Sequence, residues 1–117
     1  EHKQKELRYL CEHTNPEFVS LILDVGWVPR AGGRSEQVIP EFLPRIRAFH
    51  FKDFRVKDAA TDTWTELGTG YVDFPNIIET IQGKGDYWII VERDETLPNA
   101  AESAQISARY LKKLLSA

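Results

Sequence analysis

The chain has 117 residues, of which 42% are hydrophobic and 11% aromatic, enough apolar material for the core of one domain. Its formal net charge of -3 combines 15 basic and 18 acidic residues, and because they form no long basic run we expect no nucleic-acid partner. A single cysteine, Cys11, excludes an internal disulfide, and no apolar run approaches the roughly 20 residues that span a bilayer, so we expect a cytoplasmic protein with no membrane contact.

The first part of the chain predicts a helix, a strand and a second helix. Apolar residues recur at helical spacing over 7–11, and the turn-forming residues 14–16 end that pattern. The run 19–23 is apolar except for one serine, as expected for a strand buried on both faces, and Asp24 follows it. After a turn-rich stretch, residues 35–43 again repeat apolar side chains with a helical period.

The middle of the chain predicts a strand, a loop and a third helix. The strand covers 46–51 and carries His50 near its end. The segment 55–70 is long, polar and closed by glycine, which is typical of a functional loop between a strand and a helix. A helix is then expected to begin at residue 73 or 74, with proline at its first position, and to end at the glycines 83 and 85.

The last part of the chain predicts the clearest strand and the longest helix. Residues 87–91 are aromatic or branched at Cβ in all five positions, and Glu92 closes the run. The final helix is expected from about 101 to 115, where helical periodicity predicts a buried stripe of Ala104, Ala108, Leu111 and Leu115. The order α-β-α-β-α-β-α favours an α/β fold with three parallel strands.

Each of the three predicted strands ends in a side chain that binds divalent metal ions: Asp24, His50 and Glu92. In parallel β/α folds the carboxyl ends of all strands lie on one face, where ligand sites are built. The three side chains would therefore converge there, and a set of carboxylates and imidazole suits Mn, Mg, Co or Zn. Three protein ligands would also leave positions open for substrate oxygens.

Each of these residues, taken alone, has a plainer interpretation. Asp24 could cap a turn, since aspartate commonly does so after a strand. His50 could be a hydrogen-bonded histidine of the core, and Glu92 could belong to an exposed charged loop. The common position at three strand ends is what favours a metal site.

Five segments resemble the xylose isomerase-like TIM-barrel family, which groups sugar phosphate isomerases and epimerases, inosose dehydratases and relatives of the endonuclease IV fold. The resemblance spans nearly the whole chain and implies that residues 1–117 are one partial domain, the C-terminal part of a (β/α)8 barrel. The matching segments are Leu23-Asp24-Val25-Gly26-Trp27, Ala31-Gly32-Gly33, Phe49-His50-Phe51-Lys52-Asp53, Leu67-Gly68-Thr69-Gly70-Tyr71-Val72-Asp73-Phe74 and Val91-Glu92-Arg93-Asp94.

The resemblance implies that Asp24, His50 and Glu92 are three of the family's four metal ligands. The fourth is a glutamate on an earlier strand that this chain does not contain. In the family, two metal-bound glutamates move a proton on and off a carbon next to a carbonyl, so Glu92 would be catalytic as well as a ligand.

Other residues near these ends are candidates for contact with a substrate. Trp27 stands where many members of the family carry a substrate-contacting histidine, so it would form a stacking wall for a sugar ring or, alternatively, simply pack in the core. Lys52, Asp53 and Arg55 would bind substrate oxygens or orient the imidazole, or else lie in solvent. Thr69 replaces the glutamate usual in the family's Gly-Glu-Gly turn.

The resemblance favours a metal-dependent sugar or sugar phosphate isomerase or epimerase. An inosose dehydratase-type lyase is the nearest alternative, because dehydration can start from the same proton abstraction. A DNA-repair endonuclease shares the fold but needs a basic groove, which the acidic charge balance disfavours. An inactive barrel piece that binds a partner is the non-enzymatic alternative.

A complete barrel has eight strands in about 250 residues, whereas this chain supplies three strands. The chain begins at Glu1 and contains no methionine, so we expect the active protein to be longer. Without further strands the inward face of the sheet would be exposed and would associate with a missing N-terminal segment or another surface. The residues expected on that face are Leu21, Leu23, Phe49, Ile89 and Val91.

Overall fold

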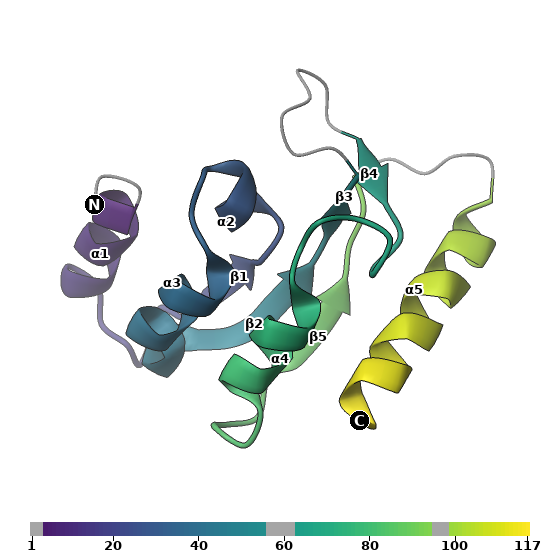
Figure 1. The fold of residues 1–117 in the computed structure, drawn as a ribbon. Helices are drawn as coiled ribbons and strands as arrows, with labels where there is room; N and C mark the ends of the chain where they lie inside the picture. Colours follow the sequence, from purple (N-terminus) through teal and green to yellow (C-terminus); the bar gives the residue numbers. More distant parts are fainter. Residues whose placement is uncertain (1–3, 56–62, 95–98) are drawn as a thin grey trace.

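The structure, a computed structural model, describes residues 4–55, 63–94 and 99–117 (Figure 1). No helix in these ranges is both long and apolar enough to cross a membrane. In chain order the helices and strands are α1 (Lys5–Glu12), β1 (Leu21–Asp24), α2 (Trp27–Arg30), α3 (Ser35–Phe42), the 3-10 helix η2 (Leu43–Arg45), β2 (Ile46–Phe51), β3 (Asp53–Phe54), β4 (Trp64–Thr65), α4 (Phe74–Ile81), β5 (Trp88–Val91) and α5 (Ala100–Leu115). The helices and strands predicted from the sequence are present, and the short elements α2, η2, β3 and β4 are additional.

The central sheet has the strand order β1-β2-β5, and both strand pairs are parallel. Because β2 lies between the other two, the ends of all three strands are neighbours. Asp24 lies opposite His50 in the register of β1 and β2, and His50 lies opposite Ile90 in that of β2 and β5. The α/β class and the three parallel strands predicted from the sequence are confirmed.

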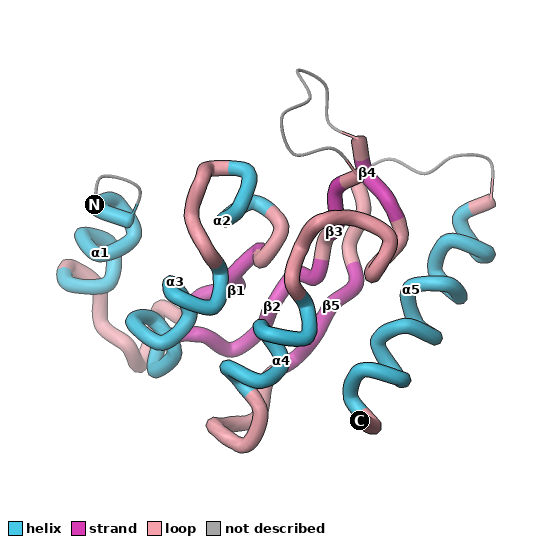
Figure 2. The backbone as a smooth tube through the Cα atoms, in the orientation of Figure 1, coloured by secondary structure: helices cyan, strands magenta, loops and turns pink. Residues whose placement is uncertain are grey.

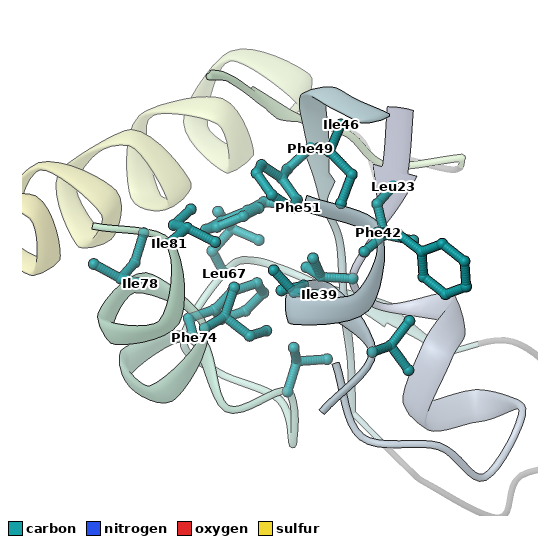
Figure 3. Packing of buried hydrophobic residues seen from close by; sticks show 14 of the residues in the cluster. Leu23, Ile39, Phe42, Ile46, Phe49, Phe51, Leu67, Phe74, Ile78 and Ile81 are labelled. Atoms are coloured by element: carbon teal, nitrogen blue, oxygen red, sulfur yellow. The ribbon is translucent and has the colours of Figure 1, made fainter. Parts of the chain in front are cut away.

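The hydrophobic core lies between this sheet and the helices α3 and α4, which lie side by side (Figures 1 and 3). Strand residues of one parity contribute Leu23, Phe49 and Phe51, and the two helices contribute their apolar faces. Pro75 stands in the first turn of α4, where its missing N–H costs no hydrogen bond, and the Asp73 side chain accepts from Asn76 N as the cap. Helix packing thus covers one face of the sheet.

The other face of the sheet carries exposed apolar side chains. Ile22 is 60% exposed and Trp88 78% exposed, and Ile90 is exposed as well. The prediction that Leu23 and Phe49 line the open face is wrong, because these side chains point toward α3 and α4 and are buried. Successive side chains of a strand point to opposite faces, and the prediction chose the wrong parity.

Helix α5 packs against α4 and β5 on a different side from the one predicted. Ala104, Ala108 and Leu115 are exposed, so that part of the predicted stripe is wrong, whereas Leu111 is partly buried as expected. Two local contacts fix the side that packs: Ser107 Oγ accepts a hydrogen bond from Leu67 N at 3.2 Å, and the Tyr110 ring lies against Gly68. The residues turned inward are Ser103, Ile106, Ser107, Tyr110, Leu111 and Leu114.

A short antiparallel hairpin, β3 with β4, extends beyond the carboxyl end of β2 (Figure 2). It occupies part of the segment 55–70 that the sequence predicts as a functional loop. Residues 56–62 of that prediction lie outside the described residues. Phe54 and Trp64 are buried in the hairpin and join the core, which holds β3 and β4 against the rest of the fold.

Candidate metal centre

Three neighbouring strand ends bring Asp24, His50 and Glu92 together. Asp24 ends β1, His50 is the fifth residue of β2, and Glu92 follows β5, where its N–H donates to Phe51 O at 3.0 Å. By alternation all three lie on the face of the sheet opposite the helices α3 and α4. Each offers a ligand atom, and these atoms all lie within 4.8 Å of one another.

This arrangement fits a divalent ion. Nitrogen or oxygen ligands of Zn²⁺ or Mg²⁺ lie about 2.0–2.2 Å from the metal, so two of them are at most about 4.4 Å apart. A separation of up to 4.8 Å therefore needs only a small inward movement of the side chains. All three residues are half-buried, so an ion between them would be partly dehydrated yet open on one side.

The Asp24 carboxylate caps a turn with one oxygen and faces Lys52 with the other. Its Oδ1 accepts hydrogen bonds from Gly26 N at 2.9 Å and from Trp27 N at 3.0 Å, as the plainer interpretation of this residue requires. Its Oδ2 lies 3.5 Å from Lys52 Nζ. Burial raises the pKa of the Asp24 carboxyl, although these two N–H groups and the nearby Lys52 ammonium act in the opposite direction.

Glu92 is the residue at which the polar contacts of the triad meet. Its Oε2 lies 3.2 Å from His50 Nδ1 and 2.8 Å from Lys52 Nζ. The contact with the imidazole links two candidate ligands directly, and the contact with the ammonium pairs the carboxylate with a buried cation. Glu92 is thus held from two sides by His50 and Lys52.

Lys52 is buried beside the triad, although it directly follows β2 and the sequence allowed a solvated position for it. Its side chain is only 3% exposed, and its Nζ lies 4.4 Å from the centre of the Trp64 ring. Burial alone would lower the pKa of a lysine, but hydrogen bonds with Glu92 and Asp94 and the charge of Asp24 outweigh that effect and raise the pKa of Lys52. Lys52 is therefore an ammonium at neutral pH.

Trp27 lies at the rim of the same region, and Arg55 is engaged elsewhere. Trp27 is 42% exposed, with its ring edge-on to Phe54 and Trp64 and 5.8 Å from Lys52 Nζ. The Arg55 guanidinium donates to Thr65 Oγ1 at 3.4 Å, so its contact is with the β3–β4 hairpin. Trp27 therefore lies beside the Lys52 ammonium at a partly exposed position, whereas Arg55 contacts the hairpin.

Asp53 is buried and binds backbone rather than the imidazole. Its Oδ1 accepts from Phe54 N at 2.9 Å and Val72 N at 3.2 Å, and its Oδ2 accepts from Gly68 N and Gly70 N, both at 3.0 Å. Burial raises the pKa of the Asp53 carboxyl against the opposing effect of these four N–H groups. Asp53 therefore anchors the loop 66–72 next to the strand that carries His50 and Lys52.

Two groups of the site were missed by sequence reasoning. Asp94 Oδ1 lies 3.0 Å from Lys52 Nζ, and Trp64 supplies the aromatic ring over the same ammonium. Asp94 could have been found, because it lies two residues after Glu92, and side chains two positions apart in an extended chain point to the same face. Trp64 could not, because its position depends on a hairpin that the sequence pattern does not indicate.

Arg93 ties the end of β5 to its surroundings. Its Nη1 donates to Glu66 Oε1 at 2.6 Å and to Ser103 Oγ at 2.9 Å, which joins the loop after β4 to α5. A hydrogen bond from its own backbone N–H, followed by those with Ser103 and Arg93, holds the pKa of the Glu66 carboxyl below its usual value. The segment that presents Glu92 is thereby fixed on the side away from the triad.

Comparisons with known proteins agree with this architecture. Inosose dehydratases from Lacticaseibacillus casei and Mesomycoplasma hyopneumoniae are 32% and 31% identical to the chain, over 91% and 96% of its length. An inosose dehydratase from Bacillus cereus is 29% identical over 92% of the chain. The chain spans between 41% and 43% of the length of these curated relatives.

Solved structures show the same fold. The crystal structure of a probable 3-DHS dehydratase from Bacillus anthracis has a TM-score of 0.69 and 20% identity, covering 97% of this chain and 43% of that one. A sugar phosphate isomerase/epimerase from Parabacteroides distasonis has a TM-score of 0.65 and 23% identity, covering 91% and 35%. The model of the xylose isomerase-like TIM barrel family matches residues 1–114. The chain therefore belongs to the xylose isomerase-like TIM barrel family, of whose barrel it forms a part.

Proposed function

We propose that this chain carries the C-terminal half of the active site of a divalent-metal-dependent lyase that removes water from an inosose or a related cyclic polyol ketone. The observation that supports this most is the convergence of Asp24, His50 and Glu92, with ligand atoms within 4.8 Å, at the carboxyl ends of three parallel strands. The substrate class is suggested by the curated relatives, which are named inosose dehydratases.

Asp24, His50 and Glu92 would hold the metal ion. When bound, the ion would supply Lewis-acid polarisation of the substrate carbonyl. The donor set of two carboxylates and one imidazole suits Mn, Mg, Co or Zn. The fourth ligand expected from the resemblance would come from a strand outside these residues.

The chain's own side chains suit a dehydration that begins with proton abstraction. Glu92 would take the proton from the carbon next to the ketone, and the electron pair of that C–H bond would form a double bond to the next carbon as its C–O bond breaks. The proton held by Glu92 would then pass to the departing hydroxide, which leaves as water. Lys52 would face the oxygen on which negative charge develops. Trp27, at the rim, would cover one face of the polyol ring.

Isomerase or epimerase chemistry, which the sequence placed first, is now the second candidate. It begins with the same proton abstraction, so the geometry of the triad serves both. The names of the curated relatives favour dehydration. Incubation of an inosose with the protein and Mn²⁺ should yield a product lighter by one water in mass spectrometry, whereas an isomerase would leave the mass unchanged.

A further proposal concerns the rest of the barrel. The exposed apolar face of the sheet, with Ile22, Trp88 and Ile90, is of the kind that associates with other surfaces. The curated relatives are more than twice as long as the stretch they share with this chain. We propose that strands of an N-terminal barrel portion cover this face and complete the site, and that neither nucleic acid nor membrane is a partner.

The metal site itself is tested by titrating the chain with Mn²⁺ in a calorimeter. Asp24→Ala and His50→Ala should each weaken binding about tenfold or more, because each removes one of three ligands. His13→Ala is the matched control, since His13 is an exposed histidine that follows α1. Equal affinities in the wild type and both triad variants would end the ligand assignment.

A further inference from the structure

The carboxylates of the site surround one lysine that is almost completely buried. Lys52 Nζ lies 2.8 Å from Glu92 Oε2, 3.0 Å from Asp94 Oδ1 and 3.5 Å from Asp24 Oδ2. Lysine is rarely buried unless it is paired, and here the Trp64 ring covers the ammonium as well. Lys52 is therefore the cation that the acidic cluster already contains.

Two of these three carboxylates are also candidate metal ligands. A divalent ion bound to Glu92 Oε2 would sit about 2 Å from an oxygen that lies 2.8 Å from the ammonium. Ammonium and metal would then be within a few ångströms of each other, where like charges repel strongly even at an effective dielectric constant of about 20. The ammonium and the metal ion therefore cannot hold contacts with Glu92 and Asp24 at the same time.

Asp94 offers the ammonium a place to remain. It is 3.0 Å from Nζ and is not part of the triad. The charges balance in this distribution, because three carboxylates carry three negative charges, which one ammonium and one divalent ion neutralise together. Without the ion, the Lys52 ammonium is the cation that pairs with all three carboxylates.

We propose that Lys52 is a built-in counter-ion that competes with the divalent cation: its ammonium holds Asp24 and Glu92 together in the ion-free chain, and it moves onto Asp94 when the ion binds. The inference rests on the proposed metal site. It adds a role for Lys52 and Asp94 that the triad alone does not define. Lys52 thereby sets the metal affinity of the site without being a ligand.

The test is Lys52→Met, which keeps the length of the side chain and removes its charge. In the ion-free protein this variant should unfold at a lower urea concentration than the wild type, because Asp24, Glu92 and Asp94 lose their cation. In a calorimetric titration its affinity for Mn²⁺ should rise about tenfold. The stability gap to the wild type should close when both proteins are saturated with Mn²⁺.

Lys84→Met is the matched control, because Lys84 is exposed in the turn after α4, and it should change neither quantity. A second variant, Asp94→Asn, should weaken Mn²⁺ binding, because the Lys52 ammonium then has no carboxylate to pair with once the ion occupies Glu92 and Asp24. In the ion-free chain, Glu92 and Asp24 still pair with the lysine. This variant keeps the proposal testable if Lys52→Met does not fold.

The outcomes separate this inference from the metal site. If Mn²⁺ binds the wild type through Asp24 and His50 but Lys52→Met binds no more tightly, the counter-ion role is overturned and the metal site stands. A stability loss in Lys52→Met that is equal with and without Mn²⁺ would show that the contribution of the lysine to stability does not depend on the ion, and it too overturns the inference. Absence of Mn²⁺ binding in wild type and variants alike overturns both proposals.

Discussion

Asp53→Asn is expected to lower the free energy of unfolding by about 3 kcal/mol. The Asp53 side chain is 1% exposed and accepts four backbone hydrogen bonds, two on each oxygen. Asparagine keeps the size of the side chain but replaces one acceptor oxygen with an NH₂ donor. Two backbone N–H groups would then face a donor in a buried place, and each such group costs about 1–3 kcal/mol. Urea unfolding followed by tryptophan fluorescence measures the loss.

The control for this variant is Asp86→Asn, which makes the same chemical change at an exposed aspartate before β5. It should leave the midpoint of unfolding unchanged, because Asp86 has no comparable set of buried partners to lose. Equal shifts in the two variants would show that the four hydrogen bonds of Asp53 add nothing beyond the removal of a charge.

The loop that Asp53 anchors also bears on the candidate site. Asp53 follows Lys52 in the chain, so its four hydrogen bonds fix the backbone at the point where β2 passes into β3. The carbonyl of Lys52 is in turn approached so closely by Gly26 that a Cβ on Gly26 would lie 2.5 Å from it. The turn after Asp24 and the segment after His50 are thus packed backbone to backbone, which sets the spacing of two candidate ligands.

The convergence of the triad could be predicted because it needs only two rules. Strands in a β/α chain are parallel, so their ends meet, and side chains alternate, so residues of one parity share a face. Asp24, His50 and Glu92 satisfy both in the structure. The prediction about exposed apolar residues used the same alternation but assigned Leu23 and Phe49 to the open face, whereas they point toward α3 and α4.

The surroundings of the triad could not be predicted, because they depend on contacts between distant segments. Lys52 and Asp53 are charged residues in sequence, and only the hairpin and the loop 66–72 make them buried. The error on α5 has the same cause. The sequence pattern predicted a stripe that includes Ala104 and Ala108, whereas the contact of Tyr110 with Gly68 turns the neighbouring side of the helix inward.

Gly70→Ala is the second variant with a large expected effect, about 3 kcal/mol in the free energy of unfolding. A Cβ at position 70 would lie 2.2 Å from Asp53 Oδ1 and 2.2 Å from Phe54 O. The carbonyl is backbone, so it cannot turn aside, and the loop would have to leave the Asp53 carboxylate to admit a methyl group. The hydrogen bond from Gly70 N to Asp53 Oδ2 and its neighbours would be lost together.

Gly83→Ala separates this close approach from backbone strain. Gly83 has φ +73° and open space around its Cβ position, so alanine there should cost only about 1–2 kcal/mol, the penalty of the left-handed conformation. If Gly70→Ala and Asp53→Asn disrupt the same anchor, the double variant should lose clearly less stability than the sum of the two single losses. Additive losses in urea unfolding would mean that the glycine and the carboxylate act separately, and that the loop beside Lys52 is held by something other than Asp53.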